Sequence, residues 1–410
     1  MLKLDLIHTL AFAGLVLMVG YGVRAALPVL ARYNIPGPVI GGLIASVIGL
    51  VAHSRNAPLW EFDTTLQAPL MIAFFTTIGF AASLRLLKVG GPQVLIFFAI
   101  ATVFAVVQNV VGAGMATLFG LHPLFGVLTG SVTLTGGPAT GLAFAPVFER
   151  AGVEGATTVA VASAMVGIVF GGVIGGPIGT RLVERFNLHD RLRTRAEVET
   201  PVATDLVEAQ LPEPAQAAPE GEDEGSWHIL KAVVLILVAM WAGSWVSAAF
   251  TAMGVTLPAY IGAMLVAAVI RNFDDAVGWI GVSQRTIDDL GNVALALFIA
   301  MALMTLKLWE ISNLALPMLA ILAVQVILVA LVCAWPVFPA MGRDYDAAVM
   351  GSGFAGFMLG TTANAMANMR SLVERYGPAP RAFLVVPMVG AFFIDFTNAV
   401  IITVFVNLLG

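Results

Sequence analysis

Residues Gly126–Pro146 read GVLTGSVTLTGGPATGLAFAP, an apolar stretch that carries five glycines and five hydroxyl side chains. Within it, Gly136-Gly137-Pro138 should stop a helix inside the bilayer, because glycine favours non-helical backbone and proline lacks an N–H. Lipid cannot satisfy the freed backbone groups, so they must face protein, water, an ion or a substrate. Free N–H groups at the start of a half-helix suit a carboxylate, and free carbonyls suit a cation. The alternative is a kinked helix that packs through small residues.

A second stretch of this kind lies in the other half of the chain, where Gly351–Arg370 read GSGFAGFMLGTTANAMANMR. Aligning Glu149 with Glu374 sets Gly136-Gly137 opposite Thr361-Thr362. The order of apolar runs around the two stretches also agrees. This order indicates an internal repeat, with chance similarity of apolar sequence as the alternative.

The composition predicts a membrane protein. Of the 410 residues, 59% are apolar and 11% are charged, whereas soluble domains carry roughly 25% charged residues. A spanning helix needs about 20 apolar residues. The first run should remain as a helix, because no small-residue cleavage site follows it. The apolar runs are Leu6–Leu27, Val39–Ala52, Pro69–Leu84, Val94–Leu118, Leu124–Pro146, Val159–Gly179, Ile229–Phe250, Leu257–Ile270, Val293–Leu308, Leu314–Phe338, Ala347–Ala367 and Phe383–Leu409.

The stretch 187–227 differs from the rest of the chain. It contains LPEPAQAAPEGEDEG and is rich in Pro, Ala and acidic residues. Such a composition cannot bury enough surface to fold, so we expect a flexible acidic linker. It divides the chain into two predicted repeats, residues 1–186 and 228–410.

The positive-inside rule selects the topology. We expect an N-terminus outside, five crossing helices in each half, and re-entrant hairpins near 124–146 and 347–367. Six crossings per half would put the basic residues that flank the linker on the wrong face. Because five is odd, the second half is inverted relative to the first, a recurring design of secondary transporters. Outside lie only Lys3, Arg55, Arg150 and Lys307; inside lie Arg24, Arg32, Arg85, Lys88, Arg181, Arg185, Arg191, Arg193, Arg195, Lys231, Arg271, Arg285, Arg343, Arg370, Arg375 and Arg381.

Several polar side chains lie in apolar runs. Asp395 lies in GAFFIDFTNAVII without a basic neighbour, and a charge at mid-bilayer costs about 2.5–3.5 kcal/mol on insertion scales. A cation ligand or a proton carrier explains it, with a structural hydrogen bond as the alternative; Asn398 shares its helix face. Asn364 and Asn368 also share one face, and their amide groups could bind sodium, a carboxylate or a neighbouring helix.

Motifs of other function classes do not occur. The sequence has neither a G-x-x-x-x-G-K-[ST] loop nor a G-x-S-x-G elbow, and no histidine pair has metal-ligand spacing. An intramembrane aspartyl protease needs two facing aspartates, and only Asp395 lies deep. A channel would show large currents without accumulation. The single Cys333 excludes an internal disulfide.

Four segments carry a family resemblance: YNIPGPVIGGL (Tyr33–Leu43), LGNVALALFIAMALMTLKLWEISNLALPMLAILAVQ (Leu290–Gln325), GRDYDAAVM (Gly342–Met350) and FLVVPMVGAFFIDFTNA (Phe383–Ala399). They closely resemble the bacterial sodium/glutamate symporters, and the resemblance extends over nearly the whole chain. It implies sodium-dependent uptake of glutamate, ten helices in two inverted halves with re-entrant loops, a homodimer, and an elevator-like movement.

The chain departs from the family pattern at both loops. The family's Gly-Gly-His-Gly-Thr-Gly motif reads Gly136-Gly137-Pro138-Ala139-Thr140-Gly141 here, so a His and a Gly are replaced. In place of an Ala-Thr-Pro-Thr-Ala loop, this chain has Gly360-Thr361-Thr362-Ala363-Asn364-Ala365. Both differences lie where the substrate site is expected.

We therefore expect an all-α polytopic membrane protein with two inverted five-helix repeats, each with a re-entrant hairpin: an elevator-type transporter and not an enzyme. It should carry L-glutamate, or a closely related acidic amino acid, into the cell with Na+ as the coupling ion and no cofactor. The alternative is a proton- or sodium-coupled carrier of another small carboxylate, such as a di- or tricarboxylate. The expected location is the bacterial inner membrane, with both termini periplasmic and the linker cytoplasmic.

The predicted site lies between the two loop tips and the last helix of each half. Expected partners are membrane lipid and a second copy of the chain, but no nucleic acid. The predicted substrate-binding residues are Thr135, Gly136, Gly137, Thr140, Gly141, Thr361, Thr362, Asn364 and Asn368. The predicted sodium-binding residues are Asp395, Asn398 and Thr133.

Overall fold

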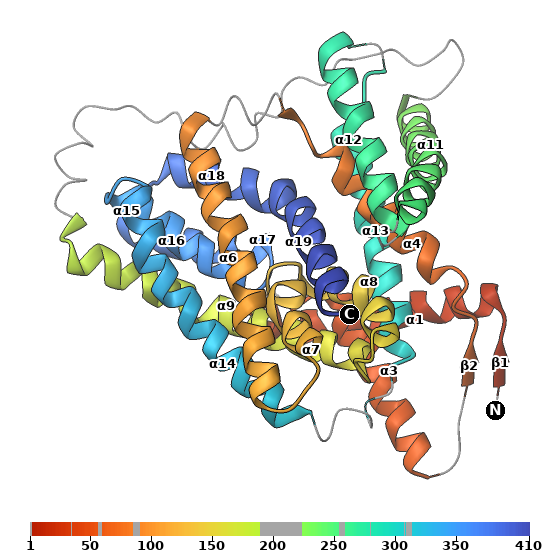
Figure 1. The fold of residues 1–410 in the computed structure, drawn as a ribbon. Helices are drawn as coiled ribbons and strands as arrows, with labels where there is room; N and C mark the ends of the chain where they lie inside the picture. The colour runs from red at the N-terminus through yellow and green to blue at the C-terminus, as the bar shows by residue number, and fades with distance from the viewer. Residues whose placement is uncertain are drawn as a thin grey trace.

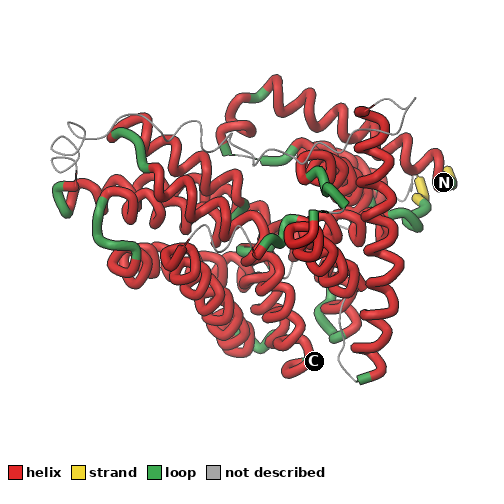
Figure 2. Tube along the Cα trace, turned by 90° about the horizontal axis from the view of Figure 1, so that it is seen from above, coloured by secondary structure: helices red, strands yellow, loops and turns green. Residues whose placement is uncertain are grey.

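The computed structural model describes residues 2–33, 35–55, 60–84, 91–188, 224–253, 259–278, 280–306, 308 and 314–410. Nearly all of the described chain is helical (Figure 2). A short parallel pair, β1 (Leu2–Leu4) and β2 (Trp60–Phe62), lies near the N-terminus. Most of the predicted linker 187–227 lies outside the described residues.

Seven described helices are long and apolar enough to cross a membrane, so the chain is a multi-pass membrane protein. Three other segments were expected to cross. α4 (Gln67–Phe80) is shorter, and α12 (Ala259–Val277) is more charged. The third is divided by the π-helical turn η4 (Val389–Phe393) into α18 (Pro380–Met388) and α19 (Ile394–Leu409). The seven are α1 (Leu6–Ala26), α3 (Gly37–Ser54), α6 (Gly91–Leu118), α9 (Ala156–Arg185), α11 (Glu224–Ala252), α13 (Gln284–Met304) and α14 (Ala315–Val332), the last continuing through η3 (Cys333–Val337) to α15 (Phe338–Ala340).

The glycine-rich stretch Gly126–Pro146 lies in a helical hairpin, here called hairpin 1. Its first arm is α7 (Pro123–Val127) with the π-helical turn η1 (Leu128–Val132), and its second arm is α8 (Gly137–Arg150). The backbone leaves helical geometry at Gly130, so the first arm ends before the Gly-Gly-Pro sequence that was expected to stop it. Gly137 has φ +67°, and Pro138 fits the first turn of a helix. The Gly-Gly-Pro sequence therefore starts the second arm.

The start and the end of each hairpin lie close together. A Cβ built on Gly410 would lie 3.5 Å from both Leu124 at the start of hairpin 1 and Ala151 at its end, and Figure 1 shows the C-terminus beside α7 and α8. Hairpin 2 consists of α16 (Tyr345–Met358) and α17 (Thr362–Tyr376). The Tyr345 hydroxyl at its start donates to the carbonyl of Gly377 at its end, over 2.6 Å.

The bases of the two hairpins lie at opposite ends of α9. Glu149, at the end of hairpin 1, accepts hydrogen bonds from the amide and hydroxyl of Thr157, in the first turn of α9. At the base of hairpin 2, the Tyr376 hydroxyl donates to Glu184 in the last turn of α9 over 3.2 Å. A helix of 30 residues is about 45 Å long, so the two hairpins approach each other from well-separated ends.

Hairpin 2 packs closely on α9. Asn364 Nδ2 donates to the carbonyl of Ile168 over 2.7 Å, and Asn368 Nδ2 donates to that of Gly171 over 2.8 Å. Four glycines spaced four residues apart on α9, from Gly167 to Gly179, permit this approach; a methyl group on Gly175, for example, would collide with the Asn368 amide. Hydrogen bonds across a small-residue contact are a common way of joining helices in lipid.

The helices form two groups. The scaffold group consists of α1, α3, α4, α11, α12 and α13, which pack on one another, and the hairpin group contains α6, α9, α14, α18, α19 and both hairpins (Figure 1). The groups meet where α13 packs on α8 and α4 on η4. Apolar side chains fill part of this contact, including Phe298 and Leu303 from the scaffold group with Leu142 from α8 and Val161 from α9.

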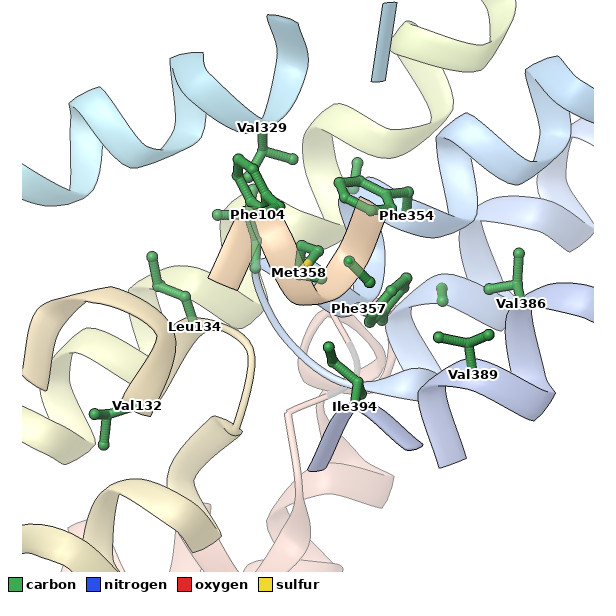
Figure 3. Packing of buried hydrophobic residues seen from close by; sticks show 14 of the residues in the cluster. Phe104, Val132, Leu134, Val329, Phe354, Phe357, Met358, Val386, Val389 and Ile394 are labelled. Carbon is green, nitrogen blue, oxygen red and sulfur yellow. The ribbon is translucent and has the colours of Figure 1, made fainter. Parts of the chain in front are cut away.

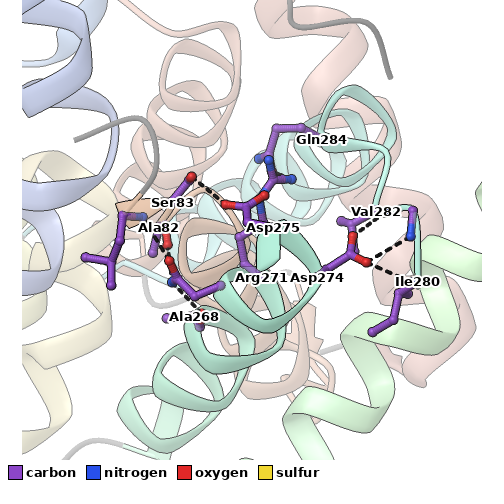
Figure 4. A network of polar contacts seen from close by, with 12 residues as sticks. Ala82, Ser83, Ala268, Arg271, Asp274, Asp275, Ile280, Val282 and Gln284 are labelled. Carbon is purple, nitrogen blue, oxygen red and sulfur yellow. Dashed lines mark hydrogen bonds and ion pairs between the residues drawn. The ribbon is translucent and has the colours of Figure 1, made fainter. Parts of the chain in front are cut away.

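A polar network ties the ends of two scaffold helices together (Figure 4). Ser83, after α4, donates to Asp275 of α12, which also pairs with Arg271 at 3.1 Å. Asp274 accepts backbone N–H groups of Ile280, Gly281 and Val282, and so holds the turn between α12 and α13. These bonds fix one end of the scaffold group.

The largest apolar cluster lies mainly in the hairpin group and extends to Phe75 and Tyr260 of the scaffold group. Figure 3 shows Met358, at the tip of hairpin 2, between Phe104 of α6 and Phe357, with Leu134 of hairpin 1 and Val329 of α14 nearby. Both tips are therefore embedded in a common core.

Candidate functional site

A cavity of about 380 Å³ lies between the two hairpin tips and the scaffold group. Hairpin 1, hairpin 2, η4 and α19 form one wall, and α1, α3, α4 and α13 form the other. Two of its lining residues, Phe357 and Ile394, are labelled in Figure 3. Its lining residues are Tyr21, Arg24, Pro36, Gly37, Pro38, Phe74, Thr135, Gly136, Gly137, Pro138, Ala139, Asn292, Leu295, Ala296, Ile299, Phe357, Gly360, Thr361, Thr362, Gly390, Ile394 and Asp395.

The tips of the hairpins touch each other at this cavity. A Cβ on Gly137 would lie 3.5 Å from the carbonyl oxygen of Gly360 and 3.9 Å from Cγ2 of Thr361. Gly137 has φ +67°, a conformation that a larger residue would adopt only with strain. A glycine here thus allows the two half-helices α8 and α17 to begin side by side.

Two helix N-termini therefore line one cavity. The first N–H groups of a helix have no intrahelical partner, and the helix dipole adds a partial positive charge. No side chain caps α8, whereas in α17 the Thr361 hydroxyl accepts from the amide of Asn364. The free N–H groups of both helices can bind carboxylate oxygens.

The cavity also contains one basic and one acidic side chain, Arg24 from α1 and Asp395 from α19. Within the described chain, neither forms an ion pair, and no hydrogen bond reaches the Asp395 carboxylate. Nε of Arg24 is buried without a partner. Both charges are therefore free to interact with a ligand rather than with each other.

Half of the predicted site residues line the cavity. These are Thr135, Gly136, Gly137, Thr361, Thr362 and Asp395. The other half lie behind it, and their roles in binding remain predictions: Thr140, Gly141, Asn364, Asn368, Asn398 and Thr133.

The residues behind the tips have protein partners. Asn364 and Asn368 bind carbonyls of α9, as described above. The Thr133 hydroxyl donates to the Leu128 carbonyl over 2.8 Å, and Gly141 packs beside Thr133 and Ala160. These contacts position the tips.

Asp395 lies near the middle of a continuous helical path, as the sequence indicated, because the backbone keeps helical dihedral angles from α18 through η4 into α19. It occupies the first turn of α19, directly after the π-helical turn η4. Asn398, one turn further on, is fully buried and donates to the carbonyl of Ser131 over 2.9 Å.

The scaffold wall was missed by sequence reasoning. Arg24 was assigned only to the inside charge cluster, and Asn292 and Tyr21 were not singled out. A signal was present in two cases, because Pro36-Gly37-Pro38 and Asn292 lie in segments that carry the family resemblance. The sequence gives no indication of which scaffold helix faces the tips.

The sequence matches the family described as "Sodium/glutamate symporter" over residues 2–378. The sodium/glutamate symporter of Escherichia coli (strain K12) is 41% identical over the whole of this chain and 99% of its own length. That of Haemophilus influenzae is 38% identical over 97% of this chain and 96% of its own length.

Among solved structures, a sodium proton antiporter of Methanocaldococcus jannaschii aligns with 99% of this chain and 98% of its own. Its TM-score is 0.45 and its sequence identity 14%. This likeness is too weak to support an argument about the site.

Proposed function

The chain belongs to the sodium/glutamate symporter family, and from this premise we propose that it carries glutamate, or a closely related acidic amino acid, into the cell together with sodium. It is a transporter and not an enzyme. The other carrier considered from the sequence, a proton- or sodium-coupled carrier of a di- or tricarboxylate, has no support in the comparisons.

One observation carries the assignment of substrate: the charge pattern of the cavity matches that of glutamate. Glutamate has two carboxylates and one ammonium group. The cavity offers Arg24 and the N-termini of α8 and α17 to the carboxylates, and Asp395 to a cation. Arg24 can bind a carboxylate through two parallel hydrogen bonds. Asp395 is left for the ammonium group or for sodium.

Each predicted residue then has a role. Thr135, Gly136, Gly137, Thr361 and Thr362 offer hydroxyl and backbone N–H groups to the substrate, and Thr140, Gly141, Asn364 and Asn368 support the tips that present them. Sodium interacts with Asp395, with Asn398 and Thr133 behind it. Each sodium that enters at 100 mV contributes about 2.3 kcal/mol, and a tenfold gradient adds about 1.4 kcal/mol.

The proposal extends to the architecture. Two inverted halves, each with a re-entrant hairpin, would place the hairpin bases on opposite membrane faces. The separation of the two bases along α9 supports this topology. The N- and C-termini would then be periplasmic and the linker cytoplasmic, in a bacterial inner membrane.

A sliding movement of the hairpin group against the scaffold group would expose the cavity to each side in turn. The apolar contact between Phe298, Leu303 and Leu142 supports such an elevator movement, because it contains no directional bonds that would have to break. The scaffold group would remain fixed, with a second copy of the chain as its partner in a homodimer.

Uptake of labelled glutamate into proteoliposomes tests the proposed function. An inward sodium gradient should drive accumulation, and replacement of sodium by choline at constant pH should abolish it. Aspartate and glutamate homologues should compete, and dicarboxylates without an amino group should compete weakly. Equal uptake in choline, or stronger competition by dicarboxylates than by glutamate, would contradict the assignment.

A further inference from the structure

A second polar cluster lies behind hairpin 1, and none of its members lines the cavity. Three side chains form it: Asn109 of α6, Ser131 of η1 and Asn398 of α19, each 0% exposed. Asn109 Oδ1 accepts the amide N–H of Ser131 over 2.9 Å, and Asn398 Nδ2 donates to the carbonyl of Ser131, also over 2.9 Å. Two helices, α6 and α19, thus converge on one residue of the broken arm.

Polar atoms of this cluster lack partners. Within the described chain, neither Ser131 Oγ nor Asn398 Oδ1 has a hydrogen-bond partner, and Asn109 Nδ2 is also without one. An unsatisfied buried polar group costs about 1–3 kcal/mol. One unpartnered oxygen belongs to Ser131 and the other to the Asn398 side chain that binds it. Two such oxygens in the interior of a membrane protein suggest a cation, which oxygen atoms can coordinate.

The backbone at this place favours a cation. The first arm of hairpin 1 ends at η1, and the chain leaves helical geometry at Gly130, beside Ser131. The end of the arm carries the negative end of its helix dipole. A carbonyl that accepts one hydrogen bond, as that of Leu128 does from the Thr133 hydroxyl, keeps a second lone pair for a cation. Broken helices in secondary transporters coordinate sodium through such carbonyls. Asp395 lies one helical turn before Asn398 and adds a negative charge nearby.

We propose that Ser131 Oγ and Asn398 Oδ1, together with carbonyl groups of the broken arm, bind one sodium ion in a site separate from the cavity. Asn109 is a positioning residue, because its Oδ1 fixes the amide of Ser131. The sequence alone predicts that Asn398 and Asp395 bind sodium together. The structure adds Ser131 and Asn109, and the proposed ion position therefore lies behind hairpin 1 and not in the cavity. The inference rests on the proposed sodium coupling and specifies where one ion binds.

Thermal unfolding of the purified full-length protein, titrated with NaCl against choline chloride and without glutamate, tests the site. Ser131→Ala removes a hydroxyl that has no protein partner, so in choline the variant should unfold at the wild-type temperature or above. Its half-maximal stabilisation should require at least tenfold more sodium than the wild type. Ser352→Ala is the matched control, because Ser352 Oγ on α16 is also buried without a partner; its sodium requirement should not change.

A second variant should have the opposite effect. Asn109→Asp keeps the oxygen that accepts from Ser131 and replaces only the unpartnered Nδ2 by a second oxygen. The added charge should lower the sodium concentration for half-maximal stabilisation and destabilise the protein in choline. A sodium requirement that is unchanged in both Ser131→Ala and Asn109→Asp would mean that only water occupies the cluster, and would overturn the proposal.

Uptake assays separate this inference from the proposed function. If wild-type proteoliposomes accumulate glutamate with sodium but Ser131→Ala retains the wild-type sodium dependence, the site is refuted and the function stands. If the wild type neither accumulates glutamate nor gains stability from sodium, both are refuted.

Discussion

The Thr135 hydroxyl at the tip of hairpin 1 donates to Oε1 of Gln108 over 2.7 Å, and both residues are buried. Nε2 of the same Gln108 donates to the carbonyl of Met358, at the tip of hairpin 2, over 3.1 Å. One side chain of α6 therefore joins both tips. The cavity wall that they form is held as a unit.

Replacing Gln108 should loosen this unit. Gln108→Leu removes both bonds and leaves Thr135 without its oxygen acceptor, so we expect a loss of about 1–3 kcal/mol in unfolding free energy and a higher KM for glutamate. Gln325→Leu is the control: Gln325 is equally buried but donates only to the backbone carbonyl of Gln108. Thermal unfolding and uptake kinetics would show whether KM rises in Gln108→Leu alone; an equal rise in both variants would refute the link.

Asp395→Asn should abolish sodium-driven uptake while the protein still folds. The substitution keeps the size of the side chain and removes a charge that no described protein group pairs with. Loss of a charged interaction of about 3 kcal/mol corresponds to a roughly 100-fold weaker response to sodium. Uptake measured over a range of sodium concentrations, with folding checked by size-exclusion chromatography, tests this. Unchanged sodium dependence would remove Asp395 from the mechanism.

Arg24→Gln should change selectivity. If the guanidinium binds a substrate carboxylate, its loss should raise the KM for glutamate by roughly 10- to 100-fold, the equivalent of about 1.5–3 kcal/mol. Glutamine, which carries an amide in place of one carboxylate, should compete better than it does in the wild type. Arg181→Gln, at an exposed position of α9, should leave both values unchanged. A variant with wild-type KM and selectivity would show that Arg24 does not bind the substrate and is only one of the basic residues on the cytoplasmic side.

The contact of hairpin 2 with α9 should tolerate no side chain at Gly175. Gly175→Ala would push the Asn368 amide away from its bond to Gly171, and overpacking of this kind costs about 1–3 kcal/mol. Gly172→Ala meets nothing within 4 Å and should instead stabilise the helix by roughly 0.5–1 kcal/mol. Thermal unfolding of the pair gives the comparison. Similar unfolding temperatures would contradict the close packing described here.

The hairpins can be predicted from the sequence because the residues that break each helix lie within a single short segment. Glycine, proline and hydroxyl residues in an apolar run identify a broken segment, and a carboxylate such as Asp395 in another run identifies a polar interior. Partners across the structure are not local. Nothing in the sequence of α17 tells that Asn364 binds Ile168 rather than a ligand, or that Arg24 faces the tips.

The break in hairpin 1 illustrates the same limit. Gly136-Gly137-Pro138 was expected to end a helix, but the backbone already leaves helical geometry at Gly130, beside the Asn109 side chain. A Cβ at Gly130 would lie 3.0 Å from Asn109 Oδ1. The position of the break thus depends on packing against α6, which residue propensities do not describe.

In the proposed topology, two hairpins enter the membrane from opposite faces and meet at one cavity. The direct test is labelling of single cysteines at Leu118, Glu149, Arg181 and Glu374, all exposed, by a membrane-impermeant maleimide in a Cys333→Ala background. In right-side-out vesicles, Glu149→Cys should react while Arg181→Cys and Glu374→Cys stay protected, and inside-out vesicles should reverse the pattern. Leu118→Cys, at the end of α6 just before hairpin 1, should react from the same face as Glu149→Cys, just after it. Reaction of these two cysteines from opposite faces would show that hairpin 1 crosses the membrane, and would contradict the re-entrant hairpin.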